Sequence, residues 1–196
     1  MTWKLHRAWK FWGDTRAVAA VEFAIVAPFM LLLYIGGVEL GNGLAIGVKV
    51  SETAHTVADL VSRNACVTDS TLGTMLGASS ATIAPYSATN ATIQVAQLQI
   101  TDTSGTTTLN WGKVLTNGAV SDMPQSPPPT LPQAVIDTVV ANAKPTTGAP
   151  LYLIFSAVQY NYTPNLGYVI NGTLPISDSY YLFPRVTTSV QYPCTS

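Results

Sequence analysis

The 196-residue chain has little charge, few histidines and only two cysteines. Charged residues make up 10% of it, and nine basic residues nearly balance ten acidic ones. This composition excludes a nucleic-acid-binding protein, which needs a cationic face to displace counterions. Hydrophobic residues make up 47% of the chain, which excludes intrinsic disorder. Serine and threonine supply a fifth of the residues, and with so little charge this favours a membrane-linked or extracytoplasmic protein.

Groups that could carry out catalysis are also scarce. Residues 65–196 contain no histidine, no Gly-x-Ser-x-Gly motif and no phosphate-binding loop. Their acidic residues stand singly, at Asp69, Asp102, Asp122, Asp137 and Asp178. General acid–base catalysis needs titratable groups that converge, so we expect no catalytic residue and no enzyme. His55 has no second histidine or cysteine at helical spacing, and we expect no metal, cofactor or small-molecule substrate.

The N-terminal region predicts one membrane-spanning helix. Its first sixteen residues mix aromatic side chains with four basic ones: Lys4, Arg7, Lys10 and Arg16. Such a flank stays at the cytoplasmic surface of a membrane. The apolar run from Ala17 to Val38 contains one charge, Glu22. As a helix it would be about 33 Å long, close to the hydrocarbon thickness of a bilayer.

Three interpretations of this run compete. A cleaved secretory signal has a shorter apolar region, of about 7–15 residues. A plain membrane anchor leaves Glu22 unexplained, because a carboxylate at that depth costs about 2.5 kcal/mol or more. In the third interpretation, a partner molecule neutralises Glu22.

The third interpretation rests on a family resemblance. The segment Arg16–Pro28, RAVAAVEFAIVAP, resembles the start of the TadE-like family, pilin-like proteins of the tight-adherence (Flp) pilus. The resemblance implies cleavage by a prepilin peptidase between Ala17 and Val18, although family members usually have glycine where this chain has Ala17. It also implies that Glu22, followed by Phe23, becomes the fifth residue of the mature chain. There Glu22 would pair with the freed amine of Val18 on a neighbouring subunit and set the register of assembly.

The resemblance also implies a location and partners. The protein would cross the bacterial inner membrane once, with a cytoplasmic N-terminus and a periplasmic C-terminal domain, and would be extracellular in an assembled pilus that serves cell adhesion. Its partners would be other pilins and pseudopilins, the prepilin peptidase, the inner-membrane assembly platform and membrane lipid. The alternative is an uncleaved, membrane-anchored periplasmic scaffold of the same machine.

The helical pattern continues beyond the apolar run. Val50, Ala54, Val57 and Val61 share one helical face, and Asp59 and Arg63 form a favourable i, i+4 pair. With the cut that the resemblance implies, the chain divides into a leader at 1–17, a transmembrane and stalk helix at 18–64, and an outer domain at 65–196. Small residues at i, i+4 spacing indicate either close helix packing or a break in the helix. These residues are Gly37, Gly41, Gly43 and Gly47.

The outer domain is predicted to be β-rich, which makes the whole chain α+β. We expect four strands, at Ala91–Thr101 with a bulge, Leu109–Leu115, Leu151–Tyr162 and Val186–Tyr192. One short helix is expected after a capping box at Thr130, preceded by a stiff, proline-rich loop or protein-binding segment at Pro124–Pro129.

Two further features mark this domain. Cys66 and Cys194 bracket it, and a disulfide between them would contribute about 5 kcal/mol through loop entropy. Two free thiols or an intermolecular bond are the alternatives. The segments Val158–Pro164 and Tyr180–Arg185 also resemble aromatic, proline-containing motifs of TadE-like proteins.

Overall fold

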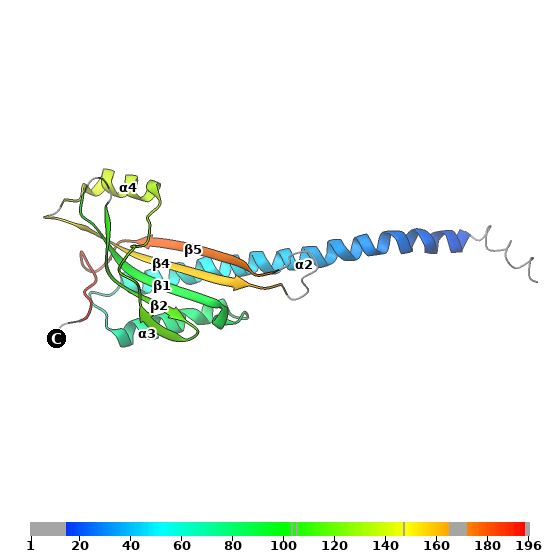
Figure 1. Ribbon diagram of the computed structural model, residues 1–196, viewed down its shortest axis with the longest axis horizontal. Helices are drawn as coiled ribbons and strands as arrows, with labels where there is room; N and C mark the ends of the chain where they lie inside the picture. Colours follow the sequence, from blue (N-terminus) through cyan, green and yellow to red (C-terminus); the bar gives the residue numbers. More distant parts are fainter. Residues whose placement is uncertain (1–14, 103, 105, 147, 165–171, 195–196) are drawn as a thin grey trace, which may run out of the picture. The chain divides into compact units, whose positions relative to one another are not determined.

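The computed structural model describes residues 15–102, 104, 106–146, 148–164 and 172–194, and the fold is α+β as predicted (Figure 1). Contacts divide the chain into two compact units, which are described separately below. The first unit comprises Met1–Gly43 with Thr163–Gly172, and the second comprises Leu44–Tyr162 with Thr173–Ser196.

Helix α2, Thr15–Ser62, runs without interruption and contains Pro28. The predicted break at the glycines is therefore wrong. None of the described helix glycines has a positive φ, and apolar residues between them maintain the helical pattern. Each glycine costs only about 1 kcal/mol relative to alanine, which is too little to end a long apolar helix.

The second unit contains a five-stranded antiparallel sheet in the order β3-β2-β1-β4-β5. The strands are β1 (Ala91–Ile100), β2 (Thr107–Thr116), β3 (Ala119–Asp122), β4 (Leu151–Tyr162) and β5 (Leu174–Leu182). Three-residue 3₁₀ turns at Ala81–Ile83 and Ala88–Asn90 lead into β1. Asn117 and Gly118 have positive φ values of 51° and 78°, as a tight hairpin between β2 and β3 requires.

The main core lies between this sheet and two helical segments, the C-terminal part of α2 and α3 (Asp69–Ser80). The predicted stripe on α2 is confirmed, because Val50, Ala54, Val57 and Val61 are all fully buried. They pack in the same cluster as inward-facing residues of the sheet, among them Ile93, Val95, Ile154 and Val158.

The predicted irregularity in β1 is a bulge in the β1–β2 pairing. Gln97 pairs with Trp111 and Leu98 pairs with Leu109, so Asn110 is the extra residue, on β2 rather than on β1. The bulge puts Leu109 and Trp111 in cores on opposite faces of the sheet. In the second half of β1 both faces are buried, and this explains its change of pattern.

The second face of the sheet is covered in part by α4 (Gln133–Ala143) and by the segment before it. Val139 on α4 packs with Ile100 and Leu153. The predicted capping box at Thr130 does not form, because the helix begins at Gln133 and no side chain caps it. Pro132 explains this, since a proline disfavours helical geometry at the residue before it.

Three elements were not expected, and one predicted strand is absent. Helix α3 is rich in Ser, Thr and Gly, and it is capped reciprocally by Thr68 and Thr71 rather than by an acidic residue. The prediction of a single short helix in this region was therefore wrong. Edge strand β3 is exposed throughout, and edge strand β5 is partly exposed and partly half-buried, so neither has a buried stripe. Val186–Tyr192 is not a strand, because β5 already occupies the edge beside β4.

Gly112 on β2 gives a test of the packing. A Cβ added there would lie 2.9 Å from the Met123 Cβ and 3.2 Å from the Ala96 Cβ, and neither atom can rotate away. We expect Gly112→Ala to lower the free energy of unfolding by about 1–3 kcal/mol. Gly77 on α3 has nothing within 4 Å of its added Cβ. Gly77→Ala should therefore raise that free energy by about 0.5–1 kcal/mol. Thermal unfolding of both variants in detergent checks the contrast, and similar shifts would contradict this packing.

Candidate functional site

The apolar part of α2 exposes its side chains in the isolated chain. Val18 is 53% exposed, Phe23 72% and Leu33 77%, and Glu22 is exposed among them. The helix is long and apolar enough to cross a membrane, and none of its most apolar stretch is buried. The side chain of Ala17 lies outside the described residues, so only its place within the helix is known. This surface is suited to a lipid environment and to contacts with other helices.

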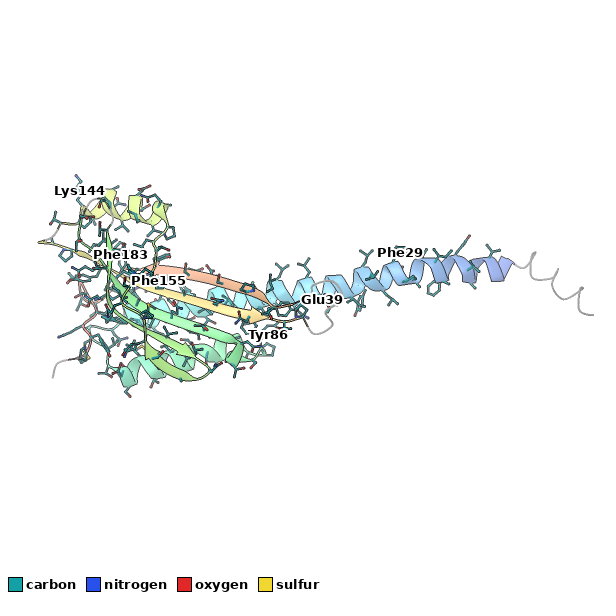
Figure 2. The ribbon with its side chains drawn as sticks, viewed as in Figure 1. Phe29, Glu39, Tyr86, Lys144, Phe155 and Phe183 are labelled. Atoms are coloured by element: carbon teal, nitrogen blue, oxygen red, sulfur yellow. A yellow bond between two sulfur atoms is a disulfide. The ribbon has the colours of Figure 1, made fainter. Side chains whose placement is uncertain are left out.

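Glu39, the second acidic residue of α2, has a different environment. Its side chain is only 2% exposed, whereas Glu22 is exposed, and Figure 2 labels Glu39 on the helix. The sequence analysis assigned no function to this residue. Of these two acids, therefore, Glu22 is exposed within the apolar run and Glu39 is buried just after it.

The glycines predicted to mediate helix packing lie in open surroundings. A Cβ added at Gly37 or Gly41 would meet no atom within 4 Å, and one at Gly47 would meet only Ile176, at 3.9 Å. Gly43 is partly buried. The described fold therefore does not use Gly37 or Gly41 for close packing, and their packing against another helix stays a prediction.

The segment after β5 is tied to the C-terminal end of α2. The backbone N–H of Arg185 donates to the Ser62 carbonyl at 2.8 Å, and thus satisfies one of the last carbonyls of the helix. The Arg185 guanidinium lies 2.9 Å from Asp59 Oδ1, and Arg63 lies 2.6 Å from Asp59 Oδ2. The predicted Asp59–Arg63 pair is confirmed. The contribution of Arg185 was missed, although its Pro-Arg motif had been noticed.

The two cysteines fasten the same end of the second unit. Cys66 and Cys194 are at disulfide distance, with Cα atoms 5.3 Å apart and a sequence separation of 128. Backbone hydrogen bonds run beside them, from Gln191 N–H to the Ala65 carbonyl and from Val67 N–H to the Gln191 carbonyl. This arrangement corresponds to the intramolecular pairing rather than to free or intermolecular thiols.

The buried Lys113 forms ion pairs with two aspartates that are far apart in the sequence. Lys113 on β2 donates to Asp69 on α3 at 2.5 Å and to Asp122 on β3, while its side chain is only 8% exposed. The Tyr192 hydroxyl also donates to Asp69, at 2.7 Å, and the Lys113 nitrogen lies 5.1 Å from the centre of the Tyr192 ring. The cluster therefore links two strands, a helix and the C-terminal segment.

The cluster shifts the ionisation of its members. Hydrogen bonds, first from Lys113 and then from Tyr192, hold the pKa of Asp69 below its usual value. The Asp122 and Asp69 carboxylates raise the pKa of the Lys113 ammonium group. Elsewhere, donation by the Thr106 backbone N–H and then by Ser104 lowers the pKa of Asp102 to about 2.

Acidic residues outside this cluster have structural partners of their own. Asp102 accepts hydrogen bonds within its own turn, and Asp137 accepts one from Gln133 on the same helix. In the described part of the chain, no three His, Cys, Asp or Glu side chains gather as a metal site. His55 is exposed, and its ring meets that of Tyr180 edge-on at 5.2 Å.

The apolar helix is similar to a known family. Residues 17–59 match the family model described as TadE-like protein. No curated protein and no solved structure matches the chain. The match confirms the resemblance predicted from Arg16–Pro28. With the apolar helix, it fits a pilus-associated membrane protein.

Replacing Lys113 tests the charged cluster. The pKa of Asp69 is lower in the folded chain, so its stabilising contribution is complete above the unfolded value of 3.8 and is lost as the pH falls through the folded pKa. The pKa of Lys113 is raised, so its contribution is complete below 10.5 and is lost as the pH rises through the folded pKa. We expect the stability difference between the wild type and Lys113→Met to be constant from about pH 5 to 9 and to shrink below about pH 4.

Urea unfolding across this pH range measures the effect. The exposed Lys144 provides the matched control, Lys144→Met, whose stability difference from the wild type should not vary with pH. A Lys113→Met difference that stays unchanged down to pH 2.5 would count against the ion pairs as its source.

Proposed function

We propose that the chain is a minor pilin, or pseudopilin, of a tight-adherence (Flp-type) pilus. It is inserted in the bacterial inner membrane with its N-terminus in the cytoplasm and residues 65–196 in the periplasm. The prepilin peptidase trims the leader, residues 1–17, between Ala17 and Val18. The mature subunit then assembles through Glu22, with Phe23 beside it, on an inner-membrane platform with other pilins.

One observation carries this proposal: an exposed carboxylate, Glu22, stands in an apolar, membrane-length helix within the segment that matches the TadE-like model. In lipid, an ionised carboxylate is stable only with a partner or after neutralisation. Trimming creates a suitable partner, because the new α-amine of Val18 is cationic at neutral pH. The pairing of two molecules lowers the cost of burying both charges.

The second unit supports a role as a subunit rather than as an enzyme. The cysteine pair and the Arg185 contacts hold its C-terminal segment in place. Its charges are few and mostly paired with one another, so much of its surface is neutral and hydroxyl-rich. Such a surface packs beside other subunits without strong repulsion.

A scaffold that keeps its leader is the second candidate. Helix α2 begins at Thr15, so both residues at the proposed cut are helical in this structure. A protease binds its substrate most readily in an extended or unwound form, and a helix that continued through the cut would oppose trimming. In this alternative Glu22 contacts a membrane protein of the assembly machine.

The N-terminus of the native protein distinguishes the two candidates. We expect mass spectrometry of the membrane-purified protein to find a chain that starts at Val18. Ala17→Lys should abolish trimming, because a small residue is needed before the cut, whereas Ala17→Gly should be trimmed at least as fully as the wild type. A wild-type chain that retains Met1 would establish the scaffold instead.

Replacement of Glu22 tests assembly separately from insertion. Glu22→Ala removes a charge from the apolar run, so the protein should still insert in the membrane. Its amount in sheared filaments should fall more than about tenfold. The α-amine of the neighbouring subunit would then enter the apolar surroundings without a partner, and an unpaired charge there costs about 2.5 kcal/mol. Glu52→Gln is the matched control, since it changes an exposed carboxylate on the same helix. Equal amounts of both variants in filaments would exclude the pairing role.

A further inference from the structure

A hollow lies on the face of the sheet opposite α2, and it belongs wholly to the second unit. Its volume is about 460 Å³, within the range of roughly 300–1,000 Å³ that ligand sites occupy. The rings of Phe155 and Tyr181 pack together in it, with centroids 5.5 Å apart (Figure 2 labels Phe155). A second hollow, of about 430 Å³, lies beside α4 and shares Ser179 and Tyr181 with the first. Because the two hollows share these lining residues, they are neighbours on the sheet face, and we call the pair the sheet groove.

The sheet groove combines a rigid wall with neutral polar groups. Three prolines line one side, Pro124, Pro127 and Pro129, and a proline loses little backbone freedom when it meets a ligand. Among the described residues that line the groove, none is charged. The polar lining consists of one amide, from Gln94, and hydroxyl groups, including those of Thr130 and Ser179.

These polar groups are available to a ligand. The Gln94 amide and the Thr130 hydroxyl make no hydrogen bond with any described residue, although Gln94 is half-buried. The Ser179 hydroxyl makes one long bond, of 3.4 Å, to the Tyr181 hydroxyl. An amide and a hydroxyl each both donate and accept hydrogen bonds.

The chemistry of the groove excludes three kinds of ligand. An ionic ligand would find no opposite charge. A purely apolar ligand would cover the Gln94 amide and the hydroxyls without satisfying them, which is costly. An extended peptide would need backbone partners, but the main-chain groups of β1 and β4 already pair with strands on both sides.

We propose that the sheet groove binds a neutral oligosaccharide. A sugar ring presents a C–H face that packs on the half-buried ring of Tyr181, which rests on the buried Phe155. Its hydroxyls both donate and accept towards Gln94, Thr130 and Ser179. Neutral hydroxyl and amide groups of the protein match such a ligand without any charge. This inference goes beyond the proposed function and does not depend on trimming or on Glu22, so either can fail alone.

The test uses the full chain in a zwitterionic detergent, because alkyl-glycoside detergents would themselves compete. The probes are chitotetraose, cellotetraose and maltotetraose, with anionic tetragalacturonate for comparison, and titration calorimetry measures the dissociation constants. We expect at least one neutral probe to bind more tightly than tetragalacturonate. Gln94→Ala should weaken that binding about five- to tenfold through lost hydrogen bonds. Gln159→Ala, on the same sheet face but outside the groove lining, should leave it within twofold.

Tyr181→Ala provides a second measurement, because it removes the sugar-stacking ring without touching Gln94. It should weaken binding of the same probe at least as much as Gln94→Ala does. Three results would overturn the proposal: no binding of any neutral probe, tighter binding of the anionic probe, or equal binding by the wild type and both groove variants.

Discussion

The second unit depends on the contact between the C-terminal part of α2 and the antiparallel sheet. Val50, Ala54, Val57 and Val61 are fully buried there, against strands β1 and β4 in the centre of the sheet. A sheet with one face packed and the other partly open to water needs such a cover. The helix that provides it is also the one that is long and apolar enough to cross a membrane, so one continuous element combines a membrane-length stretch with a folding surface.

Sequence reasoning succeeded where a pattern was long and apolar. Strand β4 was predicted with its observed bounds, and the valine stripe on α2 was predicted residue by residue. It failed where partners distant in sequence decide the structure. Helix α3 has few apolar residues, and strand β5 gains its place from pairing with β4. The segment 186–192 reads as a strand locally, yet Val190 is held by the side chains of Gln97 and Trp111.

The same limit applies to the candidate sites. Glu22 was found because its apolar surroundings along the chain make a charge conspicuous. Lys113 was missed because Asp69 and Asp122 approach it only through folding. The neutral groove could not be predicted either. Gln94 on β1 and Tyr181 on β5 line the same hollow only because β4 lies between these two strands in the sheet, and single polar residues carry no periodic pattern. Local sequence therefore indicated the apolar helix of the chain, whereas its ion-pair cluster and its polar hollow depend on tertiary structure.

The covalent link between Cys66 and Cys194 also has a mechanical meaning. It closes residues 66–194, which follow the end of α2, into a ring. A mechanical force applied to α2 acts on Cys66 and, through the disulfide, on Cys194 at the same time. The disulfide then bears this force. The strands of the sheet are therefore not separated one after another from either end of the domain. If such a protein is exposed to shear, the residues closed by the disulfide would keep their fold while the force acts on α2.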